Sequence, residues 1–179
     1  MKTIYLVRHC QAAGQEPEAP LTEKGEGQAR KLASFFDEYP IDRIISSPYQ
    51  RAIATIQPLA KERRLNIEED QRLVERVLCG VPREDWFERL RDTFDDLSLE
   101  FEGGESSLTA MNRANSLLTE ILTAEHKEIV LVSHGCLLAL LMKSVDDRFG
   151  FSDWERLSNP DVFKLTCHTE ARELVRIWS

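Results

Sequence analysis

Short apolar runs alternate with amphipathic stretches along the chain, and this alternation predicts the fold. Continuous apolar runs of strand length predict buried strands. They lie at residues 3–7 (TIYLV), 41–47 (IDRIISS) and 128–133 (EIVLVS), with a shorter extended piece near 66–69. Residues 161–168 and 173–179 alternate apolar and polar positions and are joined by TEAR, which is typical of a closing β-hairpin.

Helical spacing marks the stretches between these strands. Thr22 is a suitable cap for a helix whose apolar positions recur at intervals of three and four. Ser47 followed by Pro48 predicts the start of a second helix, and Pro58 is expected to kink or shorten it. A further buried helix is expected to begin at the apolar run CLLALLM, residues 136–142.

A third amphipathic stretch covers residues 83–97 and predicts a single helix. Its aromatic and leucine positions are expected to face inward: Trp86, Phe87, Leu90 and Phe94. After the turn EGGES, Ser106 is placed to cap a longer helix. Arg83, Trp86 and Phe87 are candidates for the side of a pocket that receives a substrate.

Strands that alternate with helices predict a three-layer α/β/α sandwich around a mostly parallel central sheet, completed by the C-terminal β-hairpin. The length of 179 residues is enough for one domain with a core, so a single domain over residues 1–179 is expected. Residues 75–104, which are more irregular, are expected to form a small lid-like insertion in it.

Composition narrows the function classes. A net charge of −8 argues against general nucleic-acid binding, and an anionic ligand would need locally concentrated positive charge. No apolar stretch has the length of a membrane span, and the start MKTIYLVRH is too short in apolar residues for a signal peptide, so a cytoplasmic protein is expected. The four cysteines lack CxxC spacing, which favours free thiols: Cys10, Cys79, Cys136 and Cys167.

Candidate chemistry gathers at the ends of three predicted strands. The first strand ends in Arg8 and His9, the second runs into a helix whose first turn carries Arg51, and the strand EIVLVS ends in His134 and Gly135. Ligands of open α/β sheets bind outside the carboxyl ends of the strands, so these residues are expected to share one pocket. Each residue alone would more often be structural, and their combination carries the prediction.

The types of these residues point to phosphate. Two guanidiniums stay charged and offer planar forks of donors, so a pair of them beside helix N-termini predicts an anionic ligand, most simply a phosphate. A neutral imidazole is able to accept a phosphoryl group and pass it to water, and a second histidine, if charged, would stabilise the transferring oxygens.

Five ordered blocks resemble the histidine phosphatase superfamily, the phosphoglycerate-mutase-like enzymes. They are LVRHCQA with PLTEKGEGQA, SSPYQRAIAT, LVERVLCG, GGES and VSHG, spread over residues 4–135. The resemblance implies that His9 is the phosphorylated nucleophile and that Arg8, Arg51 and His134 surround the phosphoryl oxygens. It also implies that Glu75 is the general acid, and that neither a metal nor a cofactor is needed. Without the resemblance, Glu75 would be interpreted as a loop carboxylate paired with Arg72 or Arg76.

The first block departs from the family at two positions. Cys10 stands where glycine is usual, so a Cβ and a thiol are expected in the phosphate pocket. The turn must then keep φ below zero at Cys10, or this residue is strained. Ala12 replaces a hydroxyl residue, and Gln11 is expected to face the pocket, where it and Gly135 would bind substrate. Cationic surroundings would activate the Cys10 thiol, so its oxidation or alkylation is expected to block the pocket.

Several functions remain open at this point. A metal-independent phosphomonoester hydrolase acting on a small phosphorylated metabolite is favoured, because the chain is short for a mutase that must shield its intermediate from water. The alternatives are phosphoglycerate-mutase-type transfer, a phosphoprotein (phosphohistidine) phosphatase and a non-catalytic phosphate sensor. A zinc site built from His9, Cys10, Cys79, His134 and Cys136 is a further, less favoured alternative.

Overall fold

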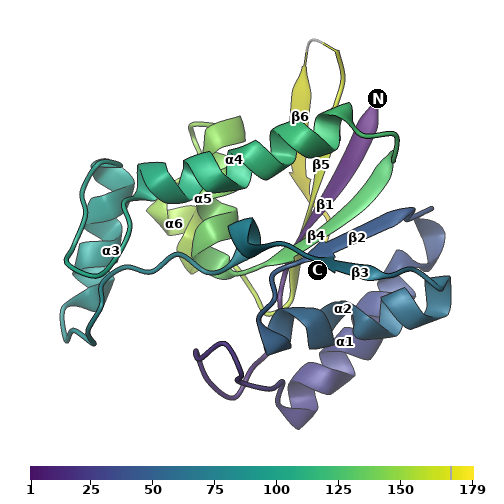
Figure 1. Cartoon of the computed structure of the whole chain (residues 1–179), viewed down its shortest axis with the longest axis horizontal. Helices are drawn as coiled ribbons and strands as arrows, with labels where there is room; N and C mark the ends of the chain where they lie inside the picture. Colours follow the sequence, from purple (N-terminus) through teal and green to yellow (C-terminus); the bar gives the residue numbers. More distant parts are fainter. Residues whose placement is uncertain (170) are drawn as a thin grey trace.

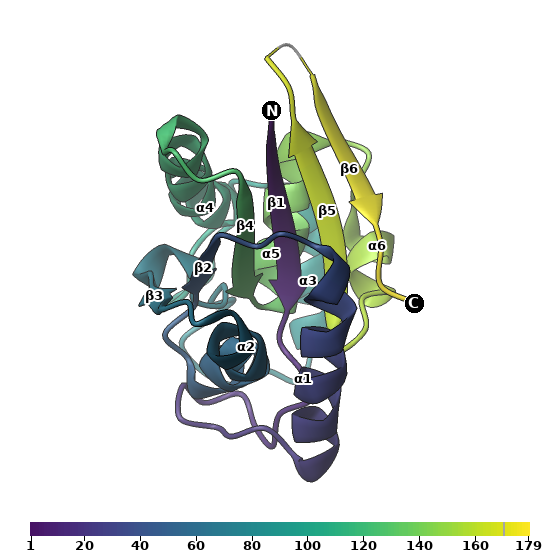
Figure 2. The same cartoon turned by 90° about the vertical axis from the view of Figure 1, so that its right-hand side faces the viewer.

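A six-stranded sheet with the order β3-β2-β4-β1-β5-β6 forms the middle layer of the protein (Figures 1 and 2). The computed structural model describes residues 1–169 and 171–179. The strands are β1 Lys2–Arg8, β2 Arg43–Ser46, β3 Ile67–Glu69, β4 Glu128–Ser133, β5 Asp161–Cys167 and β6 Arg172–Arg176. The first four are parallel, whereas β5 runs antiparallel to β1 and β6 antiparallel to β5, which confirms the mostly parallel sheet with a C-terminal strand pair.

The described residues form six α-helices, and helices pack on both faces of the sheet. They are α1 Glu23–Phe35, α2 Gln50–Arg63, α3 Trp86–Asp95, α4 Ser107–Thr123, α5 Gly135–Val145 and α6 Phe151–Glu155, with 3-10 helices at Phe36–Glu38 and Gln71–Leu73. Figure 2 shows α1 and α2 on one face and α4 and α5 on the other. In the described part of the chain, no helix combines the length and the apolar character that crossing a membrane requires.

The alternation of side chains along β1 explains the three layers. Tyr5 and Val7 belong to the core cluster under α1 and α2, whereas Ile4 and Leu6 belong to the cluster under α4 and α5. Successive residues of a strand point to opposite faces, so a strand that is apolar at every position must be covered on both sides. The predicted three-layer sandwich is therefore confirmed.

Two of the three predicted helix caps are confirmed. Thr22 Oγ1 accepts a hydrogen bond from Gly25 N at 3.0 Å, and Ser106 Oγ accepts one from Thr109 N at 3.1 Å. The start at Ser47 and Pro48 is wrong, because Ser47 N still donates to Val132 O of β4 at 2.9 Å and α2 begins at Gln50.

Pro58 does not shorten α2, contrary to expectation. The helix runs through Pro58 to Arg63, and the neighbouring residues Ile56 and Leu59 are buried in the core. We attribute its persistence to this burial, which offsets the hydrogen bond that a proline removes.

Residues 75–104 carry α3, which lies at the end of the molecule farthest to the left in Figure 1. The helix is shorter than the predicted 83–97. Leu90 and Phe94 are buried as expected, but Trp86 and Phe87 are 48% and 40% exposed, so their inward placement is wrong. They occupy the first turn of α3, and the buried positions of this helix begin only at Leu90.

Candidate active site

His9 follows directly on β1 and is fixed by its backbone. His9 N donates to Ser133 O of β4 at 3.1 Å, and His9 O accepts a hydrogen bond from Asn159 Nδ2 at 2.7 Å. On the ring, Nδ1 lies 2.7 Å from Cys10 O, and Arg51 Nε donates to Nε2 at 3.3 Å. Because a carbonyl oxygen only accepts, Nδ1 must carry the proton and Nε2 the lone pair.

The surroundings keep the His9 ring neutral. Its pKa is lowered to about 4, first by burial and then by the charges of Arg51 and Arg8, against the raising effect of the Cys10 carbonyl. Near neutral pH the ring therefore presents an unprotonated Nε2, the form that is able to attack phosphorus.

Two guanidiniums lie close enough to act on the His9 ring: Arg51, which is buried, and Arg8, which is half-buried. Arg51 is 1% exposed, and its Nη1 donates to Gln15 O at 3.1 Å and Glu16 O at 2.8 Å. Arg8 donates from Nη1 to Leu157 O at 2.9 Å, and its buried Nε has no hydrogen-bond partner in the described chain. Both guanidiniums donate to neutral backbone carbonyls, so their positive charges remain available to an anion.

Gly135 makes room for Arg8. A Cβ atom at position 135 would lie 3.0 Å from Arg8 Cζ and Nε, closer than ordinary van der Waals contact. The absence of a side chain at the start of α5 therefore lets the guanidinium lie against the backbone there.

His134 precedes α5 and lies beside His9, with ring centroids 5.1 Å apart. Its Nε2 lies 2.8 Å from Ser47 Oγ, and its buried Nδ1 has no partner among the described residues. Burial, followed by the neighbouring His9 and Arg51, lowers the pKa of His134 to about 2. A phosphoryl dianion between these groups would raise that pKa, since it supplies the opposite charge.

Glu75 lies at the N-terminus of α5. Its Oε1 accepts hydrogen bonds from Leu137 N at 2.9 Å and Arg76 N at 2.8 Å, and its Oε2 accepts one from Cys136 N at 3.1 Å. Burial raises the pKa of Glu75, and these backbone donors and the charge of Arg8 oppose the rise. A carboxyl with a raised pKa is suited to donate a proton to a leaving oxygen.

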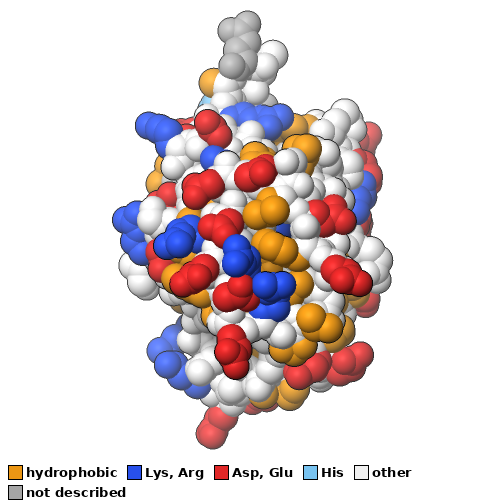
Figure 3. Space-filling model, turned by 90° about the vertical axis from the view of Figure 1, so that its left-hand side faces the viewer, with side chains coloured by type: hydrophobic (Ala, Val, Ile, Leu, Met, Phe, Trp, Pro, Cys, Tyr) orange, Lys and Arg blue, Asp and Glu red, His pale blue; other side chains and the backbone are white. Residues whose placement is uncertain are grey.

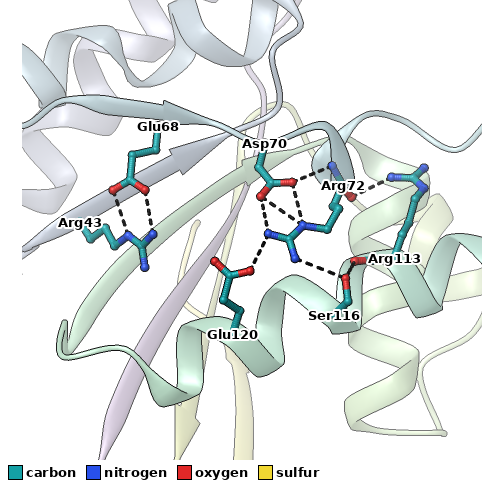
Figure 4. A network of polar contacts seen from close by, with 7 residues as sticks. All are labelled: Arg43, Glu68, Asp70, Arg72, Arg113, Ser116 and Glu120. Carbon is teal, nitrogen blue, oxygen red and sulfur yellow. Dashed lines mark hydrogen bonds and ion pairs between the residues drawn. The ribbon is translucent and has the colours of Figure 1, made fainter.

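A polar network anchors the segment that leads to Glu75 (Figure 4). Arg72 pairs with Asp70 at 2.6 Å and with Glu120 of α4 at 2.9 Å, while Arg113 of α4 donates to Arg72 O at 2.7 Å. The guanidinium of Arg72 is therefore committed to other carboxylates. The interpretation of Glu75 as a carboxylate paired with Arg72 or Arg76 is wrong, since its partners are backbone N–H groups.

The expectation that the Cys10 thiol lies in the phosphate pocket is wrong. The Cys10 side chain is fully buried with Leu21 and Ala29, and Cys10 N donates to Thr55 Oγ1 at 2.8 Å. Its φ is not positive, so the turn accommodates a Cβ without strain. Burial raises the pKa of this thiol to about 11, which removes the basis for a reactive Cys10 and for a sensor whose nucleophile is crowded.

The remaining predicted residues are less involved. Gln11 is exposed, and its backbone N–H donates to Gln28 Oε1 at 2.9 Å. Arg83 is paired with Asp85 at 2.8 Å and does not line the cavity beside Glu75. In residues 1–169 and 171–179, no three His, Cys, Asp or Glu side chains are grouped so as to hold a metal ion, which contradicts the zinc alternative.

The structure adds residues that the sequence interpretation missed. Ser47 contacts His134, and the Tyr49 ring lies 4.9 Å from that of His134 and 5.0 Å from Arg51 Cζ. Both lie within the SSPYQR block, which could have drawn attention to them. Asn159, which holds the His9 backbone, has no local sequence signal, because its segment lies 150 residues along the chain.

A cavity of about 460 Å3 adjoins this site and shares Arg8, Glu75 and Gly135 with it. A larger hollow of about 610 Å3 lies at the opposite end of the sheet, between Met1, Cys167 and Arg172. We assign the chemistry to the smaller cavity, because only that one contains the convergent arginine and the carboxyl with a raised pKa.

Known proteins resemble this chain in sequence and fold. Phosphoserine phosphatase 1 of Hydrogenobacter thermophilus is 27% identical over 150 residues, covering 75% of this chain and 71% of its own length. A Proteus mirabilis protein named "Probable phosphoglycerate mutase GpmB" is 29% identical over 163 residues, covering 81% of this chain and 75% of its own. The mycobacterial glucosyl-3-phosphoglycerate phosphatase in complex with inorganic phosphate is 25% identical with a TM-score of 0.80, covering 99% of this chain and 96% of that one.

The family assignment rests on nearly the whole chain. The sequence model of the histidine phosphatase superfamily (branch 1) matches residues 4–178, which include every block quoted above. The two histidines, two arginines and one glutamate described here converge at one edge of the sheet. The chain therefore belongs to the histidine phosphatase superfamily, branch 1.

Proposed function

We propose that this protein is a metal-independent phosphomonoester hydrolase that acts through a phosphohistidine intermediate on a small phosphorylated metabolite. The observation that carries the proposal is the tautomer of His9, whose Nδ1–H is held by Cys10 O so that the lone pair lies on Nε2 beside Arg51. Phosphatases among the relatives support the same class of reaction.

The residues divide the reaction into two displacements. In the first, His9 Nε2 forms a bond to phosphorus while the bond to the ester oxygen breaks, and Glu75 gives its proton to that oxygen. Arg8, Arg51 and His134 stabilise the charge on the phosphoryl oxygens. In the second, Glu75 takes a proton from water, the water oxygen bonds to phosphorus, and His9 leaves as the neutral imidazole.

Trapping the intermediate tests the proposal. Mixing the protein with p-nitrophenyl phosphate and quenching in alkaline SDS, which preserves phosphohistidine, should give a phosphopeptide containing His9. His9→Ala should lose both the phosphopeptide and the activity, by about 10³-fold or more. His126→Ala, which removes an exposed histidine elsewhere, should change neither. Turnover that survives His9→Ala would refute the mechanism.

Mutase-type transfer is the second candidate, because a relative carries the mutase name. It shares the first displacement and differs in the acceptor. Incubation with 3-phosphoglycerate, with and without bisphosphoglycerate, separates the two functions. Release of phosphate faster than formation of the isomer is expected for the hydrolase, and the reverse would establish the mutase.

A further inference from the structure

The leaving-group side of the site contains a third guanidinium, that of Arg76, which is buried. Arg76 is 5% exposed and lines the cavity of about 460 Å3 together with Arg8 and Glu75. Among the ion pairs of the described residues, none includes Arg8, Arg51 or Arg76. Two of these charges flank His9, which leaves the charge of Arg76 without an assigned anion.

Arg76 is held in place with one nitrogen uncommitted. Its Nε donates to Glu105 O at 3.1 Å and its Nη1 donates to Thr93 Oγ1 at 3.0 Å, while the buried Nη2 lacks a hydrogen-bond partner among the residues that the structure describes. The Cys136 thiol contacts Arg76 but is only a weak acceptor. Burial, followed by the charge of Glu75, raises the pKa of this thiol, so it stays protonated. A buried donor without a partner is unfavourable, and an anionic ligand group would satisfy it.

One part of the lining of the same cavity is apolar and aromatic. It is formed by four side chains: Leu78, Trp86, Leu90 and Trp154. Trp154 stacks on Phe151 with ring centroids 5.3 Å apart, and Phe87 lies 5.2 Å from Phe151 and 5.6 Å from Trp86. These contacts fix the rings in a cluster, so the wall is formed before a ligand binds.

This aromatic wall reaches the surface at the end of the molecule where α3 lies. Trp86 and Phe87 remain 48% and 40% exposed there. Figure 3 faces this end and shows hydrophobic side chains gathered in the middle of it among charged ones. Exposed aromatic surface that continues into a charged cavity is typical of a binding site for an amphipathic ligand.

We propose that the cavity accepts a leaving group with a flat apolar body and an anionic substituent, with Arg76 contacting the anionic group and Trp86 and Trp154 contacting the body. The inference rests on the proposed hydrolase function and specifies its substrate class as aromatic phosphomonoesters that carry a second acidic group. Arg8 and Glu75 line the same cavity, so a group bound there lies next to the residues to which the proposed mechanism assigns the phosphoryl group and the leaving oxygen.

Three phosphomonoesters test the inference on the native protein: 3-carboxyphenyl phosphate, phenyl phosphate and 3-phosphoglycerate. The two aryl esters differ only in the acidic group, and their leaving oxygens are similarly basic. We expect kcat/KM for the carboxyphenyl ester to exceed that for phenyl phosphate by at least about tenfold, as one charge-assisted contact implies. Comparable values for all three esters would overturn the inference. The kcat/KM for 1,3-phenylene bisphosphate, compared with that for the carboxyphenyl ester, then shows whether the preferred acidic group is a second phosphate or a carboxylate.

Variants assign the preference to residues. Arg76→Met should abolish the preference for the carboxyphenyl ester, whereas Arg76→Lys should retain part of it. Trp86→Ala should lower kcat/KM for both aryl esters relative to 3-phosphoglycerate, and Val81→Ala, which trims an exposed apolar side chain outside the cavity, should not. A preference that survives Arg76→Met in a protein with a native melting temperature would overturn the role of Arg76.

The two levels of the proposal fail in different ways. If the phosphohistidine mechanism of the proposed function is wrong, none of the esters phosphorylates His9. If only the substrate class is wrong, all of them phosphorylate His9 and their specificity constants are alike.

Discussion

Arg51 Nε donates a hydrogen bond to His9 Nε2 over 3.3 Å. The guanidinium that is proposed to bind the phosphoryl group therefore also contacts the lone pair of His9 that is proposed to attack it. A phosphoryl oxygen is a stronger acceptor for a guanidinium than an imidazole nitrogen is. Arrival of the substrate would therefore draw Arg51 away and free Nε2 for attack.

Glu75→Gln should affect the reaction according to the leaving group. The amide has nearly the same size but no acidic proton to give, and its NH2 group cannot accept the backbone hydrogen bond that the replaced oxygen accepted. We expect an alkyl phosphate to lose about 10²–10⁴-fold in kcat, the usual contribution of a general acid. p-Nitrophenyl phosphate, whose leaving group needs no proton, should lose far less in the first step. Pre-steady-state release of nitrophenol measures that step, and equal losses for both esters would contradict the assignment of Glu75.

Acid should destabilise the protein through its buried histidines. Below pH 6.5 the unfolded chain gains protons at His9 and His134, while the folded pKa values of about 4 and about 2 keep these rings neutral. For His9 alone, the free energy of unfolding should fall by about 3 kcal/mol between pH 6.5 and 4. The raised pKa of Glu75 acts in the opposite direction.

Urea unfolding at pH 7, 6 and 5 measures this acid effect. His134→Gln retains a partner for Ser47 but cannot titrate, so its stability should decline less steeply than that of the wild type. Identical slopes for the two proteins would show that the protonation of His134 does not contribute. Added phosphate should flatten the wild-type curve, because an anion favours the protonated rings.

Gly135→Ala should impair phosphate binding without unfolding the protein. The new methyl group would lie 3.0 Å from the Arg8 guanidinium and displace it from its present position. We expect inorganic phosphate to inhibit the variant about tenfold more weakly than the wild type, the scale of one lost charge-assisted contact. Gly150→Ala is the matched control, since a Cβ there meets nothing within 4 Å. Equal inhibition constants in Gly135→Ala and the wild type would contradict the packing argument.

Thiol labelling should distinguish the cysteines by their burial. Cys79 is partly exposed, whereas Cys10, Cys136 and Cys167 are buried. We expect iodoacetamide to modify Cys79 first and Cys10 only after unfolding, with peptide mass spectrometry identifying each site. The activity of native protein should be independent of Cys10 labelling. Rapid modification of Cys10, with protection by vanadate, would restore the sequence-based hypothesis of a thiol in the pocket.

The strands of the centre were predictable because they are apolar on both faces. β1 and β4 read as continuous apolar runs, and their parallel pairing brings Arg8 opposite Ser133 at the ligand edge. The convergence of His9 and His134 follows from this register. Most residues of the candidate site could therefore be predicted from the sequence, because they follow the ends of predicted strands.

The direction of side chains outside the regular elements was not predictable. Cys10 turns into the core because its N–H bonds to Thr55, a residue 45 positions away. Helical spacing placed Trp86 and Phe87 with the apolar set, but spacing does not say how far the partner surface extends. The role of Glu75 depended on the family resemblance, since its backbone donors on α5 form only when the fold is complete.

One short segment, residues 154–159, begins in the last turn of α6 and contributes both to the aromatic wall and to the support of His9. Trp154 forms part of the aromatic wall, Leu157 O holds Arg8, and Asn159 Nδ2 holds the His9 backbone. A substitution that reshapes the wall at Trp154 would therefore be expected to shift Asn159, five residues away, and with it the backbone of His9. Trp86 lies on a separate helix, and none of its described contacts reaches His9. Divergence of substrate range among descendants of this protein should thus proceed through α3, while residues 154–159 change slowly.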